Sequence, residues 1–278
     1  MKYAGICPDR CFERPGLPET SGSSFISNQM PAGIALHRGN HQMDKLYVVM
    51  PTYNEEANIR DVVRSWYPVL EGKNDESRPV IADGGSKDKT LEILHELEKE
   101  YPQLVVISMP GTDHGTKVWA LYDYAIKNHA DYVFQTDSDG QTQPSEFPAF
   151  WDLRNQFDAV LGNRSDREDG SDRKFVENVL RLFLFVFFGA RVPDANAPFR
   201  LMKTSLVAKY LYKLPHDFNL PNAMLCAYYS RFKENVTYRH ITFRPRQGGK
   251  NFMNPKRIIK IGWQSLGNFY RLRRDLNK

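Results

Sequence analysis

The sequence predicts an α/β fold with a mostly parallel central sheet flanked by helices, and three observations predict it. Short apolar runs alternate with longer periodic segments between residues 45 and 140, which is typical of βαβ units. A polar cluster directly follows three of the apolar runs, and ligands of such sheets bind beyond the carboxyl ends of the strands. Hydrophobic residues make up 41% of the 278 residues, which is enough for one sizeable core.

Each expected strand is a short apolar run that ends at a turn residue or a polar cluster. The first run ends at Pro51, and the fourth leads to Asp137. Between the strands, apolar residues recur at helical spacing, most regularly from Thr90 to Glu100. In chain order, the sequence predicts strands at 46–50, 79–82, 104–108 and 132–134, and helices at about 57–70, 90–100 and 117–128.

The three polar clusters are Pro51–Glu56, Asp83–Thr90 and Asp137–Gln141. The second contains two adjacent glycines, and such a tight turn lets the backbone approach a ligand. The third opens with two carboxylates at positions i and i+2, which can aim oxygens at one point. Hard cations such as Mg²⁺ and Mn²⁺ prefer oxygen ligands. Because the ends of parallel strands lie at one edge of a sheet, the clusters are expected to form a single site.

The order and spacing of these clusters resemble the three signatures of family 2 glycosyltransferases, with Asp137-Ser138-Asp139 as the acidic motif. Three later stretches, Gly162–Lys174, Val192–Asp194 and Pro198–Lys203, resemble the polyprenyl-phosphate sugar transferases, a group that includes the dolichol-phosphate mannose synthases. The resemblance covers about residues 45–250. It implies the GT-A fold, a Rossmann-like, mostly parallel sheet flanked by helices in a single catalytic domain.

The resemblance implies a role for each matching residue, with Asp83 accepting a hydrogen bond from the base of the donor. The implied ligands of Mg²⁺ or Mn²⁺ are Asp137, Asp139 and Gln141. The residues implied in binding the nucleoside-diphosphate sugar are Pro51, Tyr53, Glu55, Asp83, Ser86, Lys117 and Asp137. The residues implied in catalysis are Asp137, Asp139, Arg164, Arg173, Arg200 and Arg246. The arginines are expected to face phosphate groups, because a guanidinium binds phosphate oxygens in a bidentate way.

The implied activity is inverting, metal-dependent transfer of a hexose from a GDP- or UDP-sugar to a polyprenyl phosphate. Members of the family that attack with a sugar hydroxyl normally carry a carboxylate where Pro221-Asn222 stands here. A polyprenyl phosphate is already an anion and needs no base, so this departure favours a phosphate acceptor. Asp194 or Asp217 could serve as the base instead, and a glycan hydroxyl acceptor in surface-polysaccharide assembly is the alternative.

A third hypothesis is a subunit that binds a nucleotide sugar without turning it over. The complete set of Asp137, Asp139 and Gln141 argues against it.

The chain is expected to have three parts. Residues 1–44 are rich in Pro, Gly and Ser without periodicity and are expected to be poorly ordered, with Met43 as a candidate natural start. Residues 45–254 are expected to form the glycosyltransferase domain, and residues 255–278 a basic amphipathic helix. Neither a disulfide framework nor a paired zinc motif arises from the three cysteines, Cys7, Cys11 and Cys226.

Positive charge is concentrated toward the C-terminus. From Arg231 to Lys278, 13 Lys and Arg against 2 Asp and Glu give a net charge of +11, which leaves −6 for residues 1–230. No base-reading motif accompanies this charge, which disfavours nucleic acid as the partner. The expected partner is an anionic membrane surface, which predicts a cytoplasmic protein that is peripheral on the cytoplasmic face. A solvated basic tail is the alternative.

Several segments carry two interpretations. Val179–Phe188 is apolar but too short to span a bilayer, so it is either a buried helix or an interfacial helix that presents a lipid-linked acceptor. No transmembrane helix is expected. The loop Arg244–Lys250 is expected to grip phosphate rather than to be a surface turn. His114 either contacts the donor diphosphate or is solvated, and residues 166–172 are either a lid or a solvated loop.

Overall fold

The computed structural model describes residues 43–164, 171–245, 267 and 269–273, with the backbone alone for 171–176. The expectations for residues 1–42, for Arg246, for the side chain of Arg173, for most of the C-terminal helix and for residues 166–170 of the charged loop lie outside this description.

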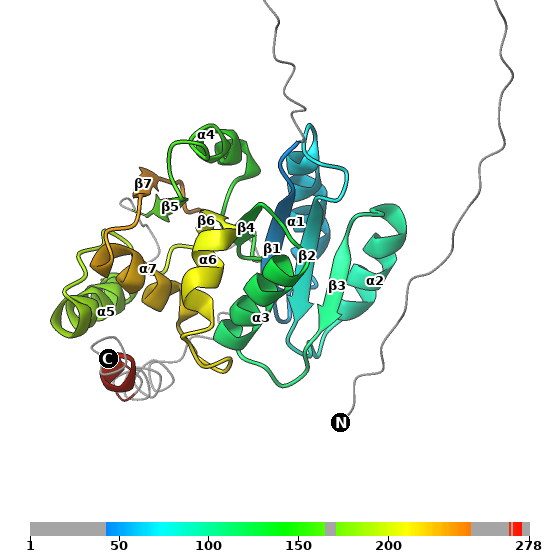
Figure 1. Cartoon of the computed structure of the whole chain (residues 1–278). Helices are drawn as coiled ribbons and strands as arrows, with labels where there is room; N and C mark the ends of the chain where they lie inside the picture. Colours follow the sequence, from blue (N-terminus) through cyan, green and yellow to red (C-terminus); the bar gives the residue numbers. More distant parts are fainter. Residues whose placement is uncertain (1–42, 165–170, 246–266, 268, 274–278) are drawn as a thin grey trace, which may run out of the picture. The chain divides into compact units, whose positions relative to one another are not determined.

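A seven-stranded sheet forms the centre of the described chain (Figure 1). Its strands are β1 Leu46–Thr52, β2 Arg78–Asp83, β3 Val105–Ser108, β4 Tyr132–Thr136, β5 Ala159–Asn163, β6 Phe199–Lys203 and β7 Val236–His240. They lie in the order β3-β2-β1-β4-β6-β5-β7. Only β6 is antiparallel to its neighbours, β4 and β5. The predicted α/β class with a mostly parallel sheet is therefore confirmed.

Helices fill the connections between strands, as the alternating pattern predicted. The α-helices are α1 Ile59–Trp66, α2 Thr90–Glu100, α3 His114–Lys127, α4 Phe147–Trp151, α5 Ser171–Phe188, α6 Thr204–Leu211 and α7 Pro221–Arg231. Two 3₁₀ turns extend this set: η1 Tyr67–Leu70 directly follows α1, and η2 Pro144–Glu146 directly precedes α4.

Two helix boundaries differ from the predicted ones for local reasons. The expected helix at 57–70 splits, because α1 ends at Trp66 and the chain continues as η1. Pro68 lies in that turn, and a proline lacks the N–H that a continuing α-helix needs. α3 begins at His114, three residues before the predicted start, because the side chain of Asp113 caps it by accepting a hydrogen bond from the Thr116 amide at 2.9 Å.

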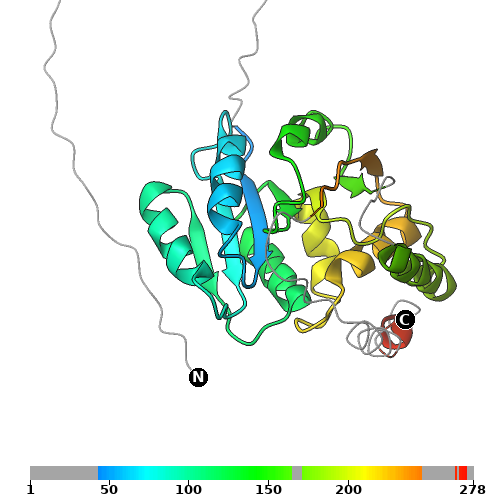
Figure 2. The same ribbon diagram turned by 180° about the vertical axis from the view of Figure 1, so that it is seen from behind.

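The sheet separates two hydrophobic cores. On β1, Tyr47 and Val49 belong to one core and Leu46 and Val48 to the other, which is the period-2 alternation of a strand with two buried faces. Side chains of α3, α5, α6 and α7 contribute to the first core, and side chains of α1, α2 and α4 contribute to the second. Helices α3 and α6 lie in front of the sheet in Figure 1, and α1 lies in front of it in Figure 2. Both faces of the sheet are covered, so the site is expected where the strands end.

Parallel pairing brings the predicted clusters to one edge. β1 pairs in parallel with β2 and with β4, so the residues after Thr52, Asp83 and Thr136 leave the sheet on the same side. β5 has the same direction, because it is antiparallel to β6, which is antiparallel to β4. Asn163, its last residue, therefore lies at that edge as well.

Helix α5 buries only part of its apolar segment, and the interfacial interpretation of the segment stays a prediction. Leu184 and Phe188 are buried in the core, at 0% and 4% exposure, whereas Leu182, Phe185 and Val186 are 57%, 46% and 57% exposed. Within the described residues no helix has the length and hydropathy needed to cross a bilayer. One face of α5 thus completes the core, and the other is an apolar stripe on the surface.

Candidate active site

The loops that follow β1 and β2 are fastened to each other by hydrogen bonds. The amide of Asn54 donates to Ser86 Oγ at 2.9 Å, and the amide of Lys87 donates to Asn54 Oδ1 at 2.7 Å. The amide of Glu55 donates to Thr90 Oγ1 at 2.7 Å. Asn54 has a positive φ of 55°, a conformation that asparagine adopts more easily than most residues. The two predicted clusters therefore form one rigid rim.

Asp83 organises the glycine turn from within. Its Oδ2 accepts hydrogen bonds from the amides of Gly85 at 2.8 Å and Ser86 at 3.0 Å, and its Oδ1 accepts one from the Ser86 hydroxyl. The residue is 0% exposed. A contact with the base of a nucleotide stays a prediction, and it requires the turn to open toward the ligand.

Lys117 places a buried ammonium beneath this rim. Its Nζ donates to the carbonyl of Thr52 at 2.7 Å and lies 5.6 Å from the centre of the Tyr53 ring. A Cβ on Gly84 would come within 2.5 Å of the same nitrogen. Glycine is therefore required at 84 for the lysine to reach this position.

The loop after β4 joins the rim through its middle residue. Ser138 Oγ donates to the carbonyl of Pro51 at 3.0 Å. The amide of Gln141 donates to Asp139 Oδ1 at 3.1 Å, which shapes the turn after the two carboxylates. Gln141 also exchanges two hydrogen bonds with the backbone of Arg244, one from its side chain at 2.7 Å and one to its carbonyl at 2.9 Å. The chain after β7 is thereby attached to the acidic loop.

Asp137 is the most perturbed carboxylate of this rim. Its pKa is raised to about 6, because desolvation and, to a smaller extent, the charge of Glu55 outweigh the opposing effects of Arg164, a hydrogen bond from Gln135, and Lys117. A quarter of its side chain is exposed, and His114 Nε2 lies 4.0 Å from its Oδ1. A partly desolvated carboxylate among convergent charges is characteristic of functional sites.

Comparison with known proteins agrees with this geometry. Residues 47–214 match the family model described as "Glycosyl transferase family 2". The chain belongs to this family. It is similar to the undecaprenyl-phosphate 4-deoxy-4-formamido-L-arabinose transferase of Pseudomonas aeruginosa strain LESB58, with 25% identity over 62% of this chain and 50% of the relative. The homonymous protein of Pseudomonas savastanoi pv. phaseolicola is 22% identical over 77% of this chain and 62% of the relative.

The chain spans about half the length of several curated relatives that it matches. Among solved structures, it is similar to glucosyl-3-phosphoglycerate synthase from Mycobacterium tuberculosis in complex with Mn²⁺, UDP and phosphoglyceric acid. That match has a TM-score of 0.61 and 18% identity, and it covers 83% of this chain and 78% of the other. The structure of the same enzyme in complex with UDP matches with a TM-score of 0.59 and 19% identity, and the match covers 83% of this chain and 80% of the other. These likenesses confirm the GT-A fold expected from the sequence.

The acidic loop of this family 2 member has the donor chemistry of a hard-cation site. Asp137 and Asp139 supply carboxylate oxygens, the ligand type that Mg²⁺ and Mn²⁺ prefer. No group of three or more His, Cys, Asp or Glu side chains that could hold a metal occurs among the described residues. Two carboxylates fit a cation that keeps other positions for water and for phosphates of a substrate. Gln141 as a third ligand stays a prediction.

Arg164 lies near Asp137 and forms a bidentate pair with Asp194. Its Nε and Nη2 donate to the two carboxylate oxygens of Asp194 at 2.7 and 2.9 Å, and Glu177 lies 3.8 Å away. The side chains of Arg164 and Asp194 are 7% and 1% exposed. These bonds use Nε and one of the Nη2 hydrogens, and the charge of Arg164 lowers the pKa of Asp137. The predicted phosphate contact of Arg164 stays a prediction.

Asp194 is poorly suited to act as a base in this arrangement. Burial raises its pKa, but hydrogen bonds and the charge of Arg164 outweigh that effect, so the pKa of Asp194 lies below its usual range. A carboxylate with a depressed pKa is a weak proton acceptor. Of the two candidate bases, only Asp217 is exposed.

The structure places Arg200 in the core, which corrects the expectation that it faces a phosphate. The residue is 0% exposed. Its guanidinium donates to the carbonyls of Ala195, Ala197 and Asn222 at 2.9, 2.9 and 3.2 Å. Because its donors are used by backbone carbonyls, Arg200 fastens the start of α7 to the chain before β6.

Glu55 and Tyr53, two further residues predicted for the site, lie in the rim. Glu55 is 6% exposed and accepts a hydrogen bond from Asn58 at 2.9 Å, which makes it part of the rim rather than an open contact. Tyr53 is half-buried beside Lys117. The side chain of Arg173 and the whole of Arg246 lie outside the described residues, so their roles stay predictions.

Sequence reasoning missed Gln135, which touches Asp137. Its Nε2 donates to Asp137 Oδ1 at 3.2 Å, and the residue is 0% exposed. The available signal was a polar residue at the end of an apolar run, since buried polar side chains are expected to have partners.

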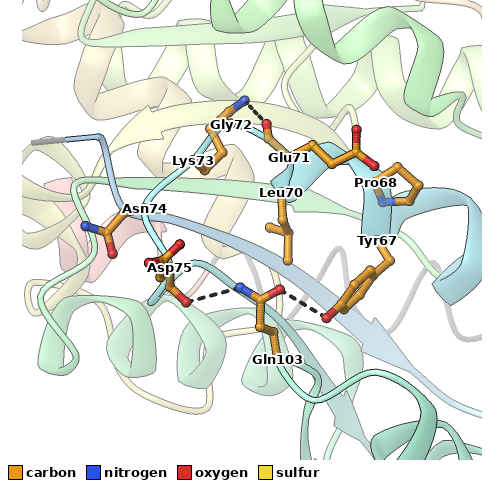
Figure 3. Close-up of a pocket in the computed structure, with 9 residues that line it drawn as sticks. All are labelled: Tyr67, Pro68, Leu70, Glu71, Gly72, Lys73, Asn74, Asp75 and Gln103. Atoms are coloured by element: carbon orange, nitrogen blue, oxygen red, sulfur yellow. Dashed lines mark hydrogen bonds between the residues drawn. The ribbon is translucent and has the colours of Figure 1, made fainter.

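A surface hollow of about 290 Å³ lies away from these residues (Figure 3). Tyr67, Lys73, Asp75 and Gln103 are among its lining residues. The loop that lines this hollow precedes β2, at the end of the strands opposite Asp137. No residue predicted for the site lines it, so it is not part of the candidate active site.

Proposed function

We propose that the protein transfers a sugar from a nucleoside-diphosphate sugar to a polyprenyl phosphate, with inversion at the anomeric carbon and with the aid of Mg²⁺ or Mn²⁺. The observation that carries the donor half is the convergence of the three strand-end clusters on Asp137. UDP is the first donor nucleotide to test, because a structural neighbour binds UDP, and GDP is the second.

The proposed chemistry is one displacement. An acceptor oxygen attacks the anomeric carbon as the bond to the nucleoside diphosphate breaks, and the electron pair leaves with the diphosphate. A bound cation at Asp137 and Asp139 would supply charge stabilisation for that leaving group. The ammonium of Lys117 adds fixed positive charge, and fixed charge needs no reorganisation during the reaction. No side chain has to form a covalent intermediate.

The acceptor half is supported by two positions at which a base was considered. Asn222, which stands where a carboxylate was expected, is 3% exposed and uncharged. Asp194 is held by Arg164. A phosphate acceptor carries its own negative charge and needs no proton acceptor. The curated relatives are named for undecaprenyl phosphate, which is a phosphate of this kind.

Contact with an anionic membrane surface is part of the proposal. The exposed stripe of Leu182, Phe185 and Val186 is an apolar face, and Arg191 places its guanidinium 5.4 Å from the Phe185 ring. Apolar side chains beside a cation suit the boundary between lipid tails and head groups. The +11 charge of residues 231–278 would add attraction to anionic lipids.

The alternative acceptor is a glycan hydroxyl, with Asp217 as the base. Asp217 is exposed in the loop before α7. That loop packs against the start of α3, where a Cβ on Gly115 would collide with the backbone of Phe218 and Asn219. Since α3 also carries His114 and Lys117, Asp217 lies on the site side of the sheet.

Asp217→Asn separates the two acceptors. With a polyprenyl phosphate acceptor we expect the transfer rate to stay within about twofold of the wild type, because no proton is abstracted. Loss of a general base would instead lower the rate about 10²- to 10⁴-fold. The rate is measured by following radiolabelled sugar into chloroform-extractable product. Asp75→Asn, an exposed aspartate at the opposite edge of the sheet, is the matched control.

Nucleotide binding tests the donor half directly. We expect UDP or GDP, with Mn²⁺, to raise the unfolding midpoint, because a ligand that binds only the folded state stabilises it by about 2.7 kcal/mol at 100 times its Kd. Thermal unfolding is recorded with UDP, GDP, CDP and their sugar conjugates, each with and without Mn²⁺. The absence of any shift would contradict the proposed donor. A shift without transfer to any acceptor would favour the non-catalytic subunit.

A further inference from the structure

Three buried side chains form a hydrogen-bonded chain that ends on Asp137. Tyr122 Oη donates to Asn222 Oδ1 at 2.7 Å, and Asn222 Nδ2 donates to Gln135 Oε1 at 3.0 Å. Gln135 Nε2 then donates to Asp137 Oδ1 at 3.2 Å. Tyr122, Asn222 and Gln135 are 0%, 3% and 0% exposed. Water is therefore poorly placed to replace the two inner bonds, Tyr122–Asn222 and Asn222–Gln135.

The chemistry of the last member fixes the direction of every bond in this chain. An ionised carboxylate only accepts hydrogen bonds, so Gln135 must turn its amide nitrogen toward Asp137. Its oxygen then faces Asn222, which must present its own nitrogen. The oxygen of Asn222 consequently faces Tyr122, whose hydroxyl must donate. Reversing Gln135 would bring its amide oxygen against the carboxylate, and reversing Asn222 would bring its oxygen against that of Gln135; both contacts are repulsive.

The backbone around the chain is held in place independently. Gln135 on β4 and Arg200 on β6 are direct cross-strand partners. Arg200 donates to the carbonyl of Asn222 at 3.2 Å, near the start of α7. Pro221, the first residue of that helix, pre-sets its first turn. The side-chain amide of Asn222 therefore approaches Gln135 from a fixed backbone position.

We propose that the Tyr122–Asn222–Gln135 chain positions Asp137, by fixing which carboxylate oxygen is held inside the protein and which is left for the metal. The inference rests on the proposed function, in which Asp137 is a metal ligand. Tyr122, Asn222 and Gln135 touch neither metal nor substrate, so they are positioning residues. Loss of such an outer partner typically lowers metal affinity or activity about 10- to 100-fold.

Asn222→Asp is the sharpest test, because it changes the hydrogen-bonding character with almost no change in volume. A carboxylate at 222 cannot donate to Gln135, so the glutamine must turn its nitrogen toward it and its oxygen toward Asp137. We expect the dissociation constant for Mn²⁺ to rise about 10- to 100-fold. It is measured in the absence of donor and acceptor, by the paramagnetic resonance signal of free Mn²⁺.

Two further variants keep the test informative. Tyr122→Phe removes only a hydroxyl from a buried ring, which frees the Asn222 amide to reverse, and a smaller rise in the Mn²⁺ dissociation constant is expected. Asn235→Asp makes the same chemical change in an exposed side chain that bonds the Gln156 carbonyl, at the opposite edge of the sheet, and should bind Mn²⁺ as the wild type does. Thermal unfolding identifies any variant that has failed to fold.

Rescue by metal distinguishes positioning from general damage. In Asn222→Asp, excess Mn²⁺ should restore most of the transfer rate, which a distorted fold would not allow. Folded Asn222→Asp and Tyr122→Phe proteins that both bind Mn²⁺ with wild-type affinity would overturn the inference alone. A wild-type protein that binds neither Mn²⁺ nor any nucleotide sugar would overturn the proposed function, and the inference with it.

Discussion

Replacing Asp137 by asparagine is expected to lower sugar transfer by about 10³-fold while leaving the protein folded. The substitution removes the negative charge that a cation needs and one carboxylate oxygen, and metal ions supply several kcal/mol of charge stabilisation in such reactions. Transfer is measured with a radiolabelled donor at saturating Mn²⁺. A residual rate within about tenfold of the wild type would contradict the role given to Asp137.

The same substitution is expected to leave the stability of the protein unchanged or higher, although it lowers the transfer rate. Desolvation raises the pKa of Asp137 to about 6, so the folded protein binds that proton more tightly than the unfolded chain does. Stability contributed by the protonated form is therefore lost as pH rises from about 4 through about 6. At pH 7.5 the folded state carries this cost, and asparagine removes it.

We therefore expect Asp137→Asn to have an unfolding midpoint at pH 7.5, without metal, that is equal to or above that of the wild type. Asp61→Asn is the matched control, because the side chain of Asp61 is 86% exposed on α1. This substitution should change neither the transfer rate nor the unfolding midpoint. A marked fall in the midpoint of Asp137→Asn would show that the lost activity reflects damage to the fold.

The second large effect is expected from Arg164→Met. This substitution leaves Asp194 charged, 1% exposed and without its bidentate partner. Breaking a buried pair by removing one member costs about 3–5 kcal/mol. For a protein of this size that corresponds to a fall of roughly 10 °C in the unfolding midpoint. Denaturant unfolding and calorimetry measure both quantities.

The double variant Arg164→Met with Asp194→Asn is the matched control for this effect. Removing both charges avoids the unpaired buried carboxylate, so the double variant should be more stable than Arg164→Met alone. A double variant that is less stable than the single one by the full cost of a second defect would contradict the ion-pair explanation.

The same pair predicts how stability changes with acid. The pKa of Asp194 lies below its usual range, so the folded state binds this proton less tightly than the unfolded chain. The stabilisation is fully present above the unfolded value of about 3.9 and is lost as pH falls through the lower folded value. The double variant has no carboxylate at position 194. Its unfolding midpoint should therefore fall less than that of the wild type over this acid range.

The strands and the acidic loop were predictable because their signals are local. An apolar run followed by a turn identifies a strand wherever the chain places it, and two aspartates at i and i+2 remain close in any loop. The direction of parallel strands then brings loops from Pro51, Asp83 and Asp137 to one edge. That step needed only the α/β pattern, and the structure has all three loops there.

Arg200 shows where local signals end. The motif around it was matched to phosphate binding, yet its strand, β6, is inserted antiparallel between β4 and β5. The side chain enters the interior and bonds backbone carbonyls. Nothing in the residues next to Arg200 specifies which strands lie on either side of it.

The sequence by itself determined the fold class, the order of the first strands and helices, and the carboxylates of the acidic loop, because each depends on neighbours along the chain. Only the tertiary structure decided what acts on those carboxylates. Asn222 and Gln135 are 87 residues apart, as are Pro51 and Ser138. Contacts of that separation depend on strand order and helix packing, and they set the burial and hydrogen bonds that tune Asp137.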